Sequence, residues 1–113
     1  MKKIFWLELL LGIAILSGCA STRYVSPDAY DLAQSAYDRK HYEQARQFYQ
    51  KFANEQPDHP MAAAALYYWA QSARACGRTR EAQEVYERLT KKYSEGFWTD
   101  MARAHLKEMG SSN

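Results

Sequence analysis

The residues of this 113-residue chain that could do chemistry are few and poorly spaced for it. The histidines His41, His59 and His105 lack the H-x-x-x-H spacing of a helical metal pair, and no Cys-x-x-Cys occurs. Asp28 and Asp31 could be paired carboxylates, but acids in the first turn of a helix are ordinary complements of the helix dipole. No Ser/His/Asp order and no glycine-rich phosphate loop occurs. We therefore predict that the protein is not an enzyme and uses no metal or cofactor.

The two cysteines have different expected roles. Cys76 is expected at the C-terminal end of a helix, where the negative end of the helix dipole opposes thiolate formation. We interpret it as a small packing residue, and an intermolecular disulfide is the alternative. Cys19 instead follows a positive start at residues 1–3 and an apolar run at residues 9–16 that is too short to span a bilayer. These features indicate a secretory leader.

The end of this leader, Leu16-Ser17-Gly18-Cys19, resembles the lipobox of bacterial lipoproteins. The resemblance implies that residues 1–18 are a signal peptide cleaved before Cys19, which then carries diacylglycerol and a further acyl chain such as palmitate. Residues 19–26 would be a lipidated flexible tether. The absence of Asp after Cys19 implies a lipid-anchored protein on the periplasmic face of the outer membrane. A plain signal peptide with a chance cysteine, or an uncleaved anchor, is the alternative.

The composition after the leader favours helices and one domain. The 95 remaining residues include 16 Ala and 14 aromatic residues but only six branched aliphatic ones, which are too few for a β-sheet. Without Lys2, Lys3 and Glu8 the chain has 13 basic and 12 acidic side chains. Because phosphate binding needs a concentrated basic face, this balance excludes nucleic acid as the main partner.

An internal repeat organises the chain. Shifting the sequence by 37 residues superposes Ala33-Gln34-Ser35-Ala36 on Ala70-Gln71-Ser72-Ala73, and it also pairs Tyr30 with Tyr67, Ala45 with Ala82 and Tyr49 with Tyr86. The same shift carries Ala65 to Ala102, which indicates a truncated third unit. Capping and breaking residues predict helices from Pro27 to about Arg39, from His41 to before Pro57, from Pro60 to Cys76, from a Thr79 cap to about Tyr93, and from Thr99 to Gly110. The domain is thus expected at 27–110, with a disordered tail at 111–113.

The spacing of small and large residues in these helices resembles the tetratricopeptide repeat (TPR). The matching residues are Leu32-Ala33, Tyr42, Ala45, Tyr49, Phe52 and Pro57 in the first unit, and Trp69-Ala70, Gly77, Ala82, Tyr86 and Leu89 in the second. The resemblance implies an all-α, antiparallel helix-hairpin solenoid of about two repeats plus a C-terminal capping helix. Lys40 stands where the turn glycine usually lies, which predicts a slightly different turn. The linker Pro57-Asp58-His59-Pro60 is similar to that of outer-membrane TPR lipoproteins of the β-barrel assembly and Tol systems.

TPR proteins usually bind peptides with the face made by the first helices of their repeats. Carried over to this chain, that face would present Tyr30, Gln34, Tyr37 and Asp38 from the first unit and Tyr67, Gln71 and Arg74 from the second, followed by Glu108. Tyrosine and arginine supply large contact areas with a polar tip, and glutamine both donates and accepts hydrogen bonds. Because Tyr30 and Tyr67 recur in the repeat, a purely structural role is the alternative for them.

The expected function is that of a lipid-anchored adaptor that binds a protein or peptide partner in an envelope assembly or secretion complex. The alternative is a self-associating structural lipoprotein, because two repeats and one helix lie below the three that usually bury a continuous core. Residues 74–92 contain six basic residues and three glutamates, a local excess of positive charge that could attract an anionic lipid or an acidic partner. A solvated helix face with local ion pairs is the simpler interpretation.

Overall fold

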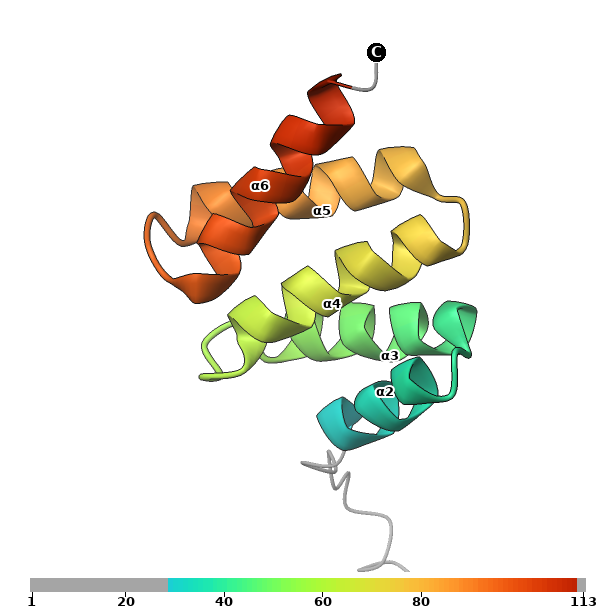
Figure 1. The fold of residues 1–113 in the computed structure, drawn as a ribbon. Helices are drawn as coiled ribbons and strands as arrows, with labels where there is room; N and C mark the ends of the chain where they lie inside the picture. The colour runs from blue at the N-terminus through green and yellow to red at the C-terminus, as the bar shows by residue number, and fades with distance from the viewer. Residues whose placement is uncertain (1–28, 112–113) are drawn as a thin grey trace, which may run out of the picture.

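The computed structural model describes residues 29–111, which form five α-helices and no strand. In chain order they are α2 (Ala29–Asp38), α3 (Tyr42–Glu55), α4 (Ala62–Ala75), α5 (Thr79–Lys92) and α6 (Phe97–Ser111). Each helix packs on the next, and α6 also contacts α4. Figure 1 shows α2, α4 and α6 on the side towards the viewer, with α3 and α5 behind them. The predicted all-α array of two helix hairpins and a C-terminal helix is confirmed.

The core is built from small residues beside large ones, as the repeat register predicted. Ala33, Ala45, Ala70 and Ala82 are completely buried and let neighbouring helices approach closely. The large side chains Tyr49, Phe52, Leu66, Tyr86 and Leu89 fill the space beside them and are likewise buried. Packing of this kind stabilises helices that would be marginal alone, since each has only 10 to 15 residues.

Both hairpins turn in the same way, which corrects one expectation. After α4, the N–H of Arg78 donates to the carbonyl of Ala73 over 2.8 Å, and Gly77 has a left-handed φ of 80°. After α2, the N–H of His41 donates to the carbonyl of Ala36 over 2.8 Å, and Lys40 has a φ of 64°. Both turns are Schellman motifs. Lys40 therefore does not change the turn; it adopts the glycine conformation at an energetic cost.

Several helix ends differ from the sequence prediction. α4 begins at Ala62, with Met61 in the N-cap position, and not at Pro60. Thr79 is the first residue of α5 and not its cap, because Arg78 holds the N-cap position without a side-chain hydrogen bond. α6 begins at Phe97, two residues before Thr99, whose buried hydroxyl donates to the carbonyl of Tyr93 over 3.0 Å. α6 also continues through Gly110 to Ser111. A glycine inside a helix is only moderately unfavourable, so it did not act as a stop signal here.

The N-terminal edge of the array is open among the described residues. Leu32 on α2 is 53% exposed, although Trp69, its partner at the 37-residue shift, is only 6% exposed. Trp69 lies on α4, which packs on α3 of the preceding hairpin, and the described chain has no helix in front of α2. The exposure of Leu32 therefore follows from its position at the start of the array.

Some predictions concern residues outside the described part. They are the signal peptide 1–18, the lipidation of Cys19, the tether 19–26, the helix start at residues 26–28 and the last two residues of the expected tail. Within residues 29–111, no helix has the length and apolarity that crossing a bilayer requires.

Candidate functional site

One hydrogen bond occurs twice at the 37-residue spacing. The hydroxyl of Tyr49 donates to Oε1 of Gln34 over 3.0 Å, and the hydroxyl of Tyr86 donates to Oε1 of Gln71 over 2.8 Å. Burial raises the pKa of both phenols, so they stay protonated donors. The bond satisfies a buried hydroxyl, which explains why tyrosine and glutamine recur together. The glutamines thus have a role inside the hairpins, and their contact with a ligand stays a prediction.

An aromatic ring from the first helix of the following repeat unit covers each of these buried tyrosines. Tyr68 of α4 stacks on Tyr49 with centroids 5.5 Å apart and an interplanar angle of 21°. His105 of α6 stacks on Tyr86 at 5.3 Å and 16°. Tyr68 and His105 are 37 residues apart, so α6 occupies the position of a first helix in a third repeat. This confirms the truncated third unit.

A polar cluster joins α4 to α6 around Tyr67. Nε2 of Gln71 donates to the Tyr67 hydroxyl over 2.7 Å, and Nε2 of His105 lies 3.0 Å from the same oxygen. Nη1 of Arg74 lies 3.3 Å from Nδ1 of His105 and 3.8 Å from Oε2 of Glu108. Tyr67 is only 5% exposed, whereas Arg74 and Glu108 are exposed. The structure therefore places Tyr67 beneath α6, in line with the structural role suggested by its repetition.

The predicted residues of α2 are divided between the core and the surface. Tyr30 packs edge-on against Tyr49 and Phe52, at centroid distances of 5.6 and 5.5 Å, and burial raises the pKa of its hydroxyl to about 12. Asp38 is exposed and accepts a hydrogen bond from Nε2 of Gln34 over 3.1 Å. Tyr37 is partly exposed. Of this group, Asp38 is thus exposed, and Tyr30, Gln34 and Tyr37 are partly exposed.

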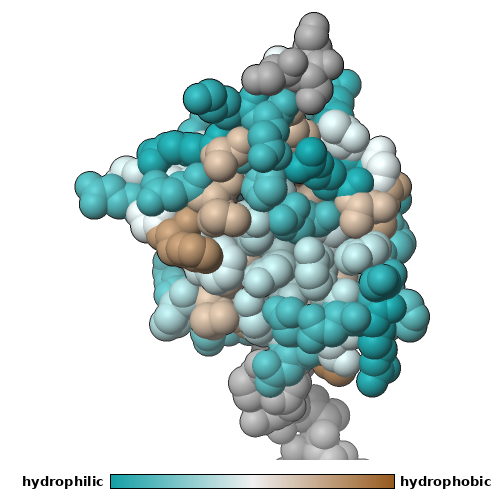
Figure 2. All heavy atoms as spheres, viewed as in Figure 1, coloured by the Kyte–Doolittle hydropathy of each residue, from teal (hydrophilic) through white to brown (hydrophobic). Residues whose placement is uncertain are grey.

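Tyr37 belongs to a continuous chain of aromatic side chains, which we call the aromatic row. Its members in spatial order are Tyr42, Tyr37, Tyr68, Trp98 and Phe97, with successive ring centroids 5.4, 5.2, 5.5 and 4.9 Å apart. The row runs from the α2–α3 turn across α4 to the beginning of α6. Four of its members are partly exposed and Phe97 is 66% exposed. In Figure 2, which looks at this face, residues of near-neutral hydropathy fill the middle over α4 and strongly hydrophilic ones lie around them.

The tyrosine hydroxyls fall into two groups. Those of Tyr49, Tyr67, Tyr86 and Tyr93 have partners within the fold. In residues 29–111, no side-chain hydrogen bond involves the hydroxyls of Tyr30, Tyr37, Tyr42 or Tyr68 or the indole N–H of Trp98, and all of these except Tyr30 belong to the row. Burial, followed by the neighbouring tyrosines, raises the pKa of Tyr37, which keeps that hydroxyl protonated. The row therefore combines apolar ring surface with several hydrogen-bond donors that the fold does not use.

The sequence identified only Tyr37 of this row as a binding residue. Tyr42 matches the TPR pattern, and the pattern does not identify Tyr68, Trp98 or Phe97 as binding residues. The available signal was the pair of adjacent aromatics in each later first helix, Tyr67-Tyr68 and Phe97-Trp98. In the first pair Tyr67 is buried and Tyr68 lies in the row, because successive helical side chains are about 100° apart, whereas both residues of the second pair lie in the row.

A charged network joins α3 to α5. Arg46 is largely buried, and its guanidinium binds Glu43 at 2.6 Å and Glu81 at 3.1 Å. The hydrogen bond from Arg46 and its charge lower the pKa of Glu43 to about 2. Cys76 is a free thiol beside this network, and burial followed by the Glu43 carboxylate raises its pKa. This favours the thiol form and agrees with a packing role.

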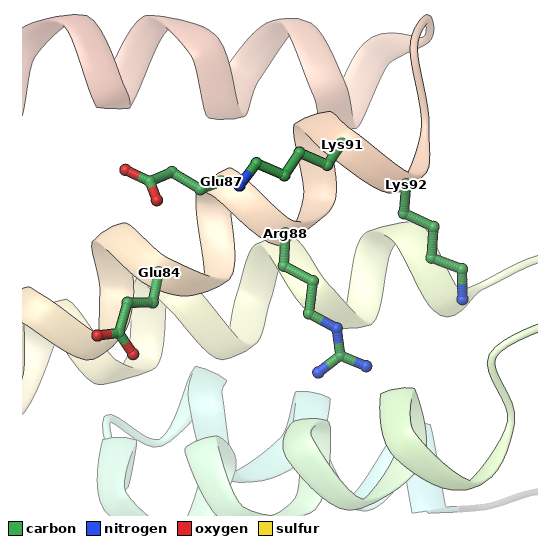
Figure 3. A pocket seen from close by; sticks show the side chains of 5 residues that line it. All are labelled: Glu84, Glu87, Arg88, Lys91 and Lys92. Carbon is green, nitrogen blue, oxygen red and sulfur yellow. The ribbon is translucent and has the colours of Figure 1, made fainter.

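The basic residues near α5 are mostly engaged in local contacts. Arg78 pairs with Glu43 at 3.3 Å, Arg80 pairs with Glu84 at 3.4 Å, and the Arg88 guanidinium lies 5.6 Å from the centre of the Trp69 ring. An open depression on this helix is lined by Glu84, Glu87, Arg88, Lys91 and Lys92. Figure 3 shows that all five belong to α5, with Arg88 and Lys92 extending downward from the helix and Glu87 and Lys91 extending to the left. The mixed charges fit a solvated helix face. Within residues 29–111, no cluster of His, Cys, Asp and Glu is suited to hold a metal ion.

The chain matches a known protein family. The model of the tetratricopeptide repeat family matches residues 29–59 and 64–96. The first segment contains α2 and α3, and the second contains nearly all of α4 and the whole of α5. No curated protein matches the chain significantly.

Proposed function

Because the chain belongs to the tetratricopeptide repeat family, whose repeats typically form non-enzymatic scaffolds for protein–protein interaction, we propose that it is a lipid-anchored adaptor in a bacterial envelope complex. Its binding surface is the face made by α2, α4 and α6. The observation that carries this proposal is the aromatic row, which crosses all three helices and offers ring surface and unused donors together. Tyrosine and tryptophan with these properties dominate the binding energy of many protein interfaces.

The shape of the row favours an extended partner segment. Four of its members come from the three successive first helices and Tyr42 begins α3, and neighbouring rings touch one after another, so a segment lying along the row meets each first helix in turn. The exposed charges of Asp38, Arg74 and Glu108 lie on the same helices and can orient the partner. The row provides the contact area for the partner segment, and these charges determine which way along the row the segment lies.

Site-specific photo-cross-linking in cells tests the binding face. A photoreactive phenylalanine derivative replaces Tyr68, a member of the row, and in a matched strain it replaces Phe48, a partly exposed aromatic residue on α3. We expect a discrete cross-linked protein from position 68 and none from position 48. A cross-link from position 48 alone would assign binding to the opposite face.

The lipid anchor rests on the sequence Leu16-Ser17-Gly18-Cys19 and has its own test. The wild-type protein is expected to incorporate labelled palmitate and to fractionate with the outer membrane. The Cys19→Ala variant is expected to lose the label and to leave that fraction. If Cys19→Ala kept full outer-membrane retention, the anchor would be wrong while the binding face would be unaffected.

The exposed Leu32 supports a second candidate function, self-association through α2. Its repeat equivalent Trp69 is only 6% exposed, so the α2 edge presents an apolar side chain at a position that is buried in the second repeat. Light scattering after size exclusion distinguishes the two functions. A dimer that Leu32→Lys converts to a monomer supports the structural role, and a wild-type monomer supports the adaptor.

A further inference from the structure

We propose that the aromatic row binds a proline-rich segment in the polyproline II conformation. This inference rests on the proposed function, because it names the class of partner for the same face. It is derived from three properties of the row: its hydrogen-bonding character, the angles between its rings, and their spacing.

The first property is a surplus of donors. Tyr37, Tyr42 and Tyr68 each offer a hydroxyl and Trp98 offers an indole N–H, and these groups have no side-chain hydrogen bond within residues 29–111. A proline-rich segment has the opposite character, since proline has a carbonyl acceptor and no N–H donor. Its backbone makes no internal hydrogen bonds in this conformation. The donors of the row and the acceptors of the segment are therefore complementary.

The second property is the angle between neighbouring rings. Tyr42 and Tyr37 meet at 77°, Tyr37 and Tyr68 at 68°, and Tyr68 and Trp98 at 59°. Rings that meet edge to face form inner corners with apolar walls. A pyrrolidine ring is compact and already fixed in shape, so it fills such a corner with little loss of conformational entropy. Aromatic-lined surfaces recognise proline-rich segments in this way in several unrelated domains.

The third property is the spacing. The corner between Tyr42 and Tyr37 and the corner between Tyr68 and Trp98 are separated by at most about 11 Å, and one turn of polyproline II advances about 9.3 Å. Prolines one turn apart can thus occupy the two corners together. Phe97, at the open end of the row and 66% exposed, extends the apolar surface beyond the second corner.

The binding test uses the full chain in detergent micelles and two synthetic 12-residue peptides. One is acetyl-(Pro-Pro-Ala)4-amide, and the other is acetyl-(Gly-Gln-Ala)4-amide, which has the same length and no proline. The readout is the indole N–H resonance of Trp98, assigned by its loss in Trp98→Phe. We expect a saturable shift with the proline peptide only. Tyr68→Phe should weaken binding about fivefold, the loss of one hydrogen bond worth about 1 kcal/mol.

Tyr93→Phe is the matched control, because its hydroxyl already donates to the carbonyl of Pro57 over 3.2 Å and is not part of the row. It should leave the affinity for the proline peptide unchanged. Equal shifts with both peptides, or no shift with either, would overturn the proline inference. So would a shift with chitotetraose in place of the proline peptide, which would indicate a glycan. The proposed binding face is separable from all of these, since its test is the cross-link at position 68, which does not depend on proline in the partner.

Discussion

The division of tyrosine hydroxyls into two groups predicts a measurable difference in stability. Tyr86 is completely buried, and its hydroxyl donates to Gln71 over 2.8 Å. Tyr86→Phe removes that donor with almost no change in side-chain volume, and the acceptor belongs to Gln71, which is partly exposed. The expected loss is therefore the net value of one hydrogen bond, about 1 kcal/mol. In a domain of 60 to 100 residues this corresponds to a fall in Tm of roughly 4–8 °C.

The assay is thermal and urea unfolding followed by circular dichroism at 222 nm. Tyr49→Phe should behave like Tyr86→Phe, because its hydroxyl makes the equivalent bond to Gln34 over 3.0 Å. Tyr42→Phe is the matched control and should stay within about 0.5 kcal/mol of the wild type, since this hydroxyl lies on the row and has no internal partner among the described residues. Equal losses in all three variants would refute the division into structural and available hydroxyls.

Three further predictions concern the scaffold. Lys40→Gly should raise the free energy of unfolding by about 0.5–1 kcal/mol, because φ is 64° at this position and glycine adopts such a φ without strain. Gly77→Ala should lower the free energy of unfolding, because φ is 80° there. Tm measures both changes. Arg46→Met should lower the free energy of unfolding in urea by about 3 kcal/mol, because it leaves the Glu81 carboxylate without its buried partner. Arg80→Met breaks an exposed ion pair and should change this free energy little. The folded-state pKa of Glu43 is about 2, below its ordinary 4.5, so its stabilising effect is complete above about pH 4.5 and is lost as pH falls towards 2. Tm measured over that range should therefore fall less in Arg46→Met than in the wild type, and identical slopes would contradict the pairing.

The repeat register made most of the fold predictable. Alanines and aromatics recur every 37 residues with helical spacing, so helix number, order and buried faces followed from it. The helix ends were harder to predict from the sequence. Lys40 occupies a left-handed position that glycine normally takes, and α6 begins before Thr99 because that side chain is needed inside the core. Both outcomes depend on tertiary packing and not on local propensity.

The candidate site was only partly predictable. The face was identified from the resemblance, but a face does not specify which tyrosines lie inside and which lie outside. Tyr67 is covered by side chains distant in the sequence, among them Trp98 and His105 of α6, 31 and 38 residues later. The same holds for the contact between Tyr68 and Trp98, which joins α4 to α6. Contacts between residues so far apart in the sequence depend on how the helices pack, and the spacing of residues within a single helix does not specify that packing.

The central claim is that the α2, α4 and α6 face binds an extended partner segment along the aromatic row. Its most direct test is an amide NMR titration of the protein with a peptide that corresponds to the partner segment cross-linked at position 68. We predict that the shifted resonances cluster around Tyr37, Tyr68 and Trp98, while those of the exposed surface of α3 and α5 do not move. Shifts confined to α3 and α5 would contradict the claim.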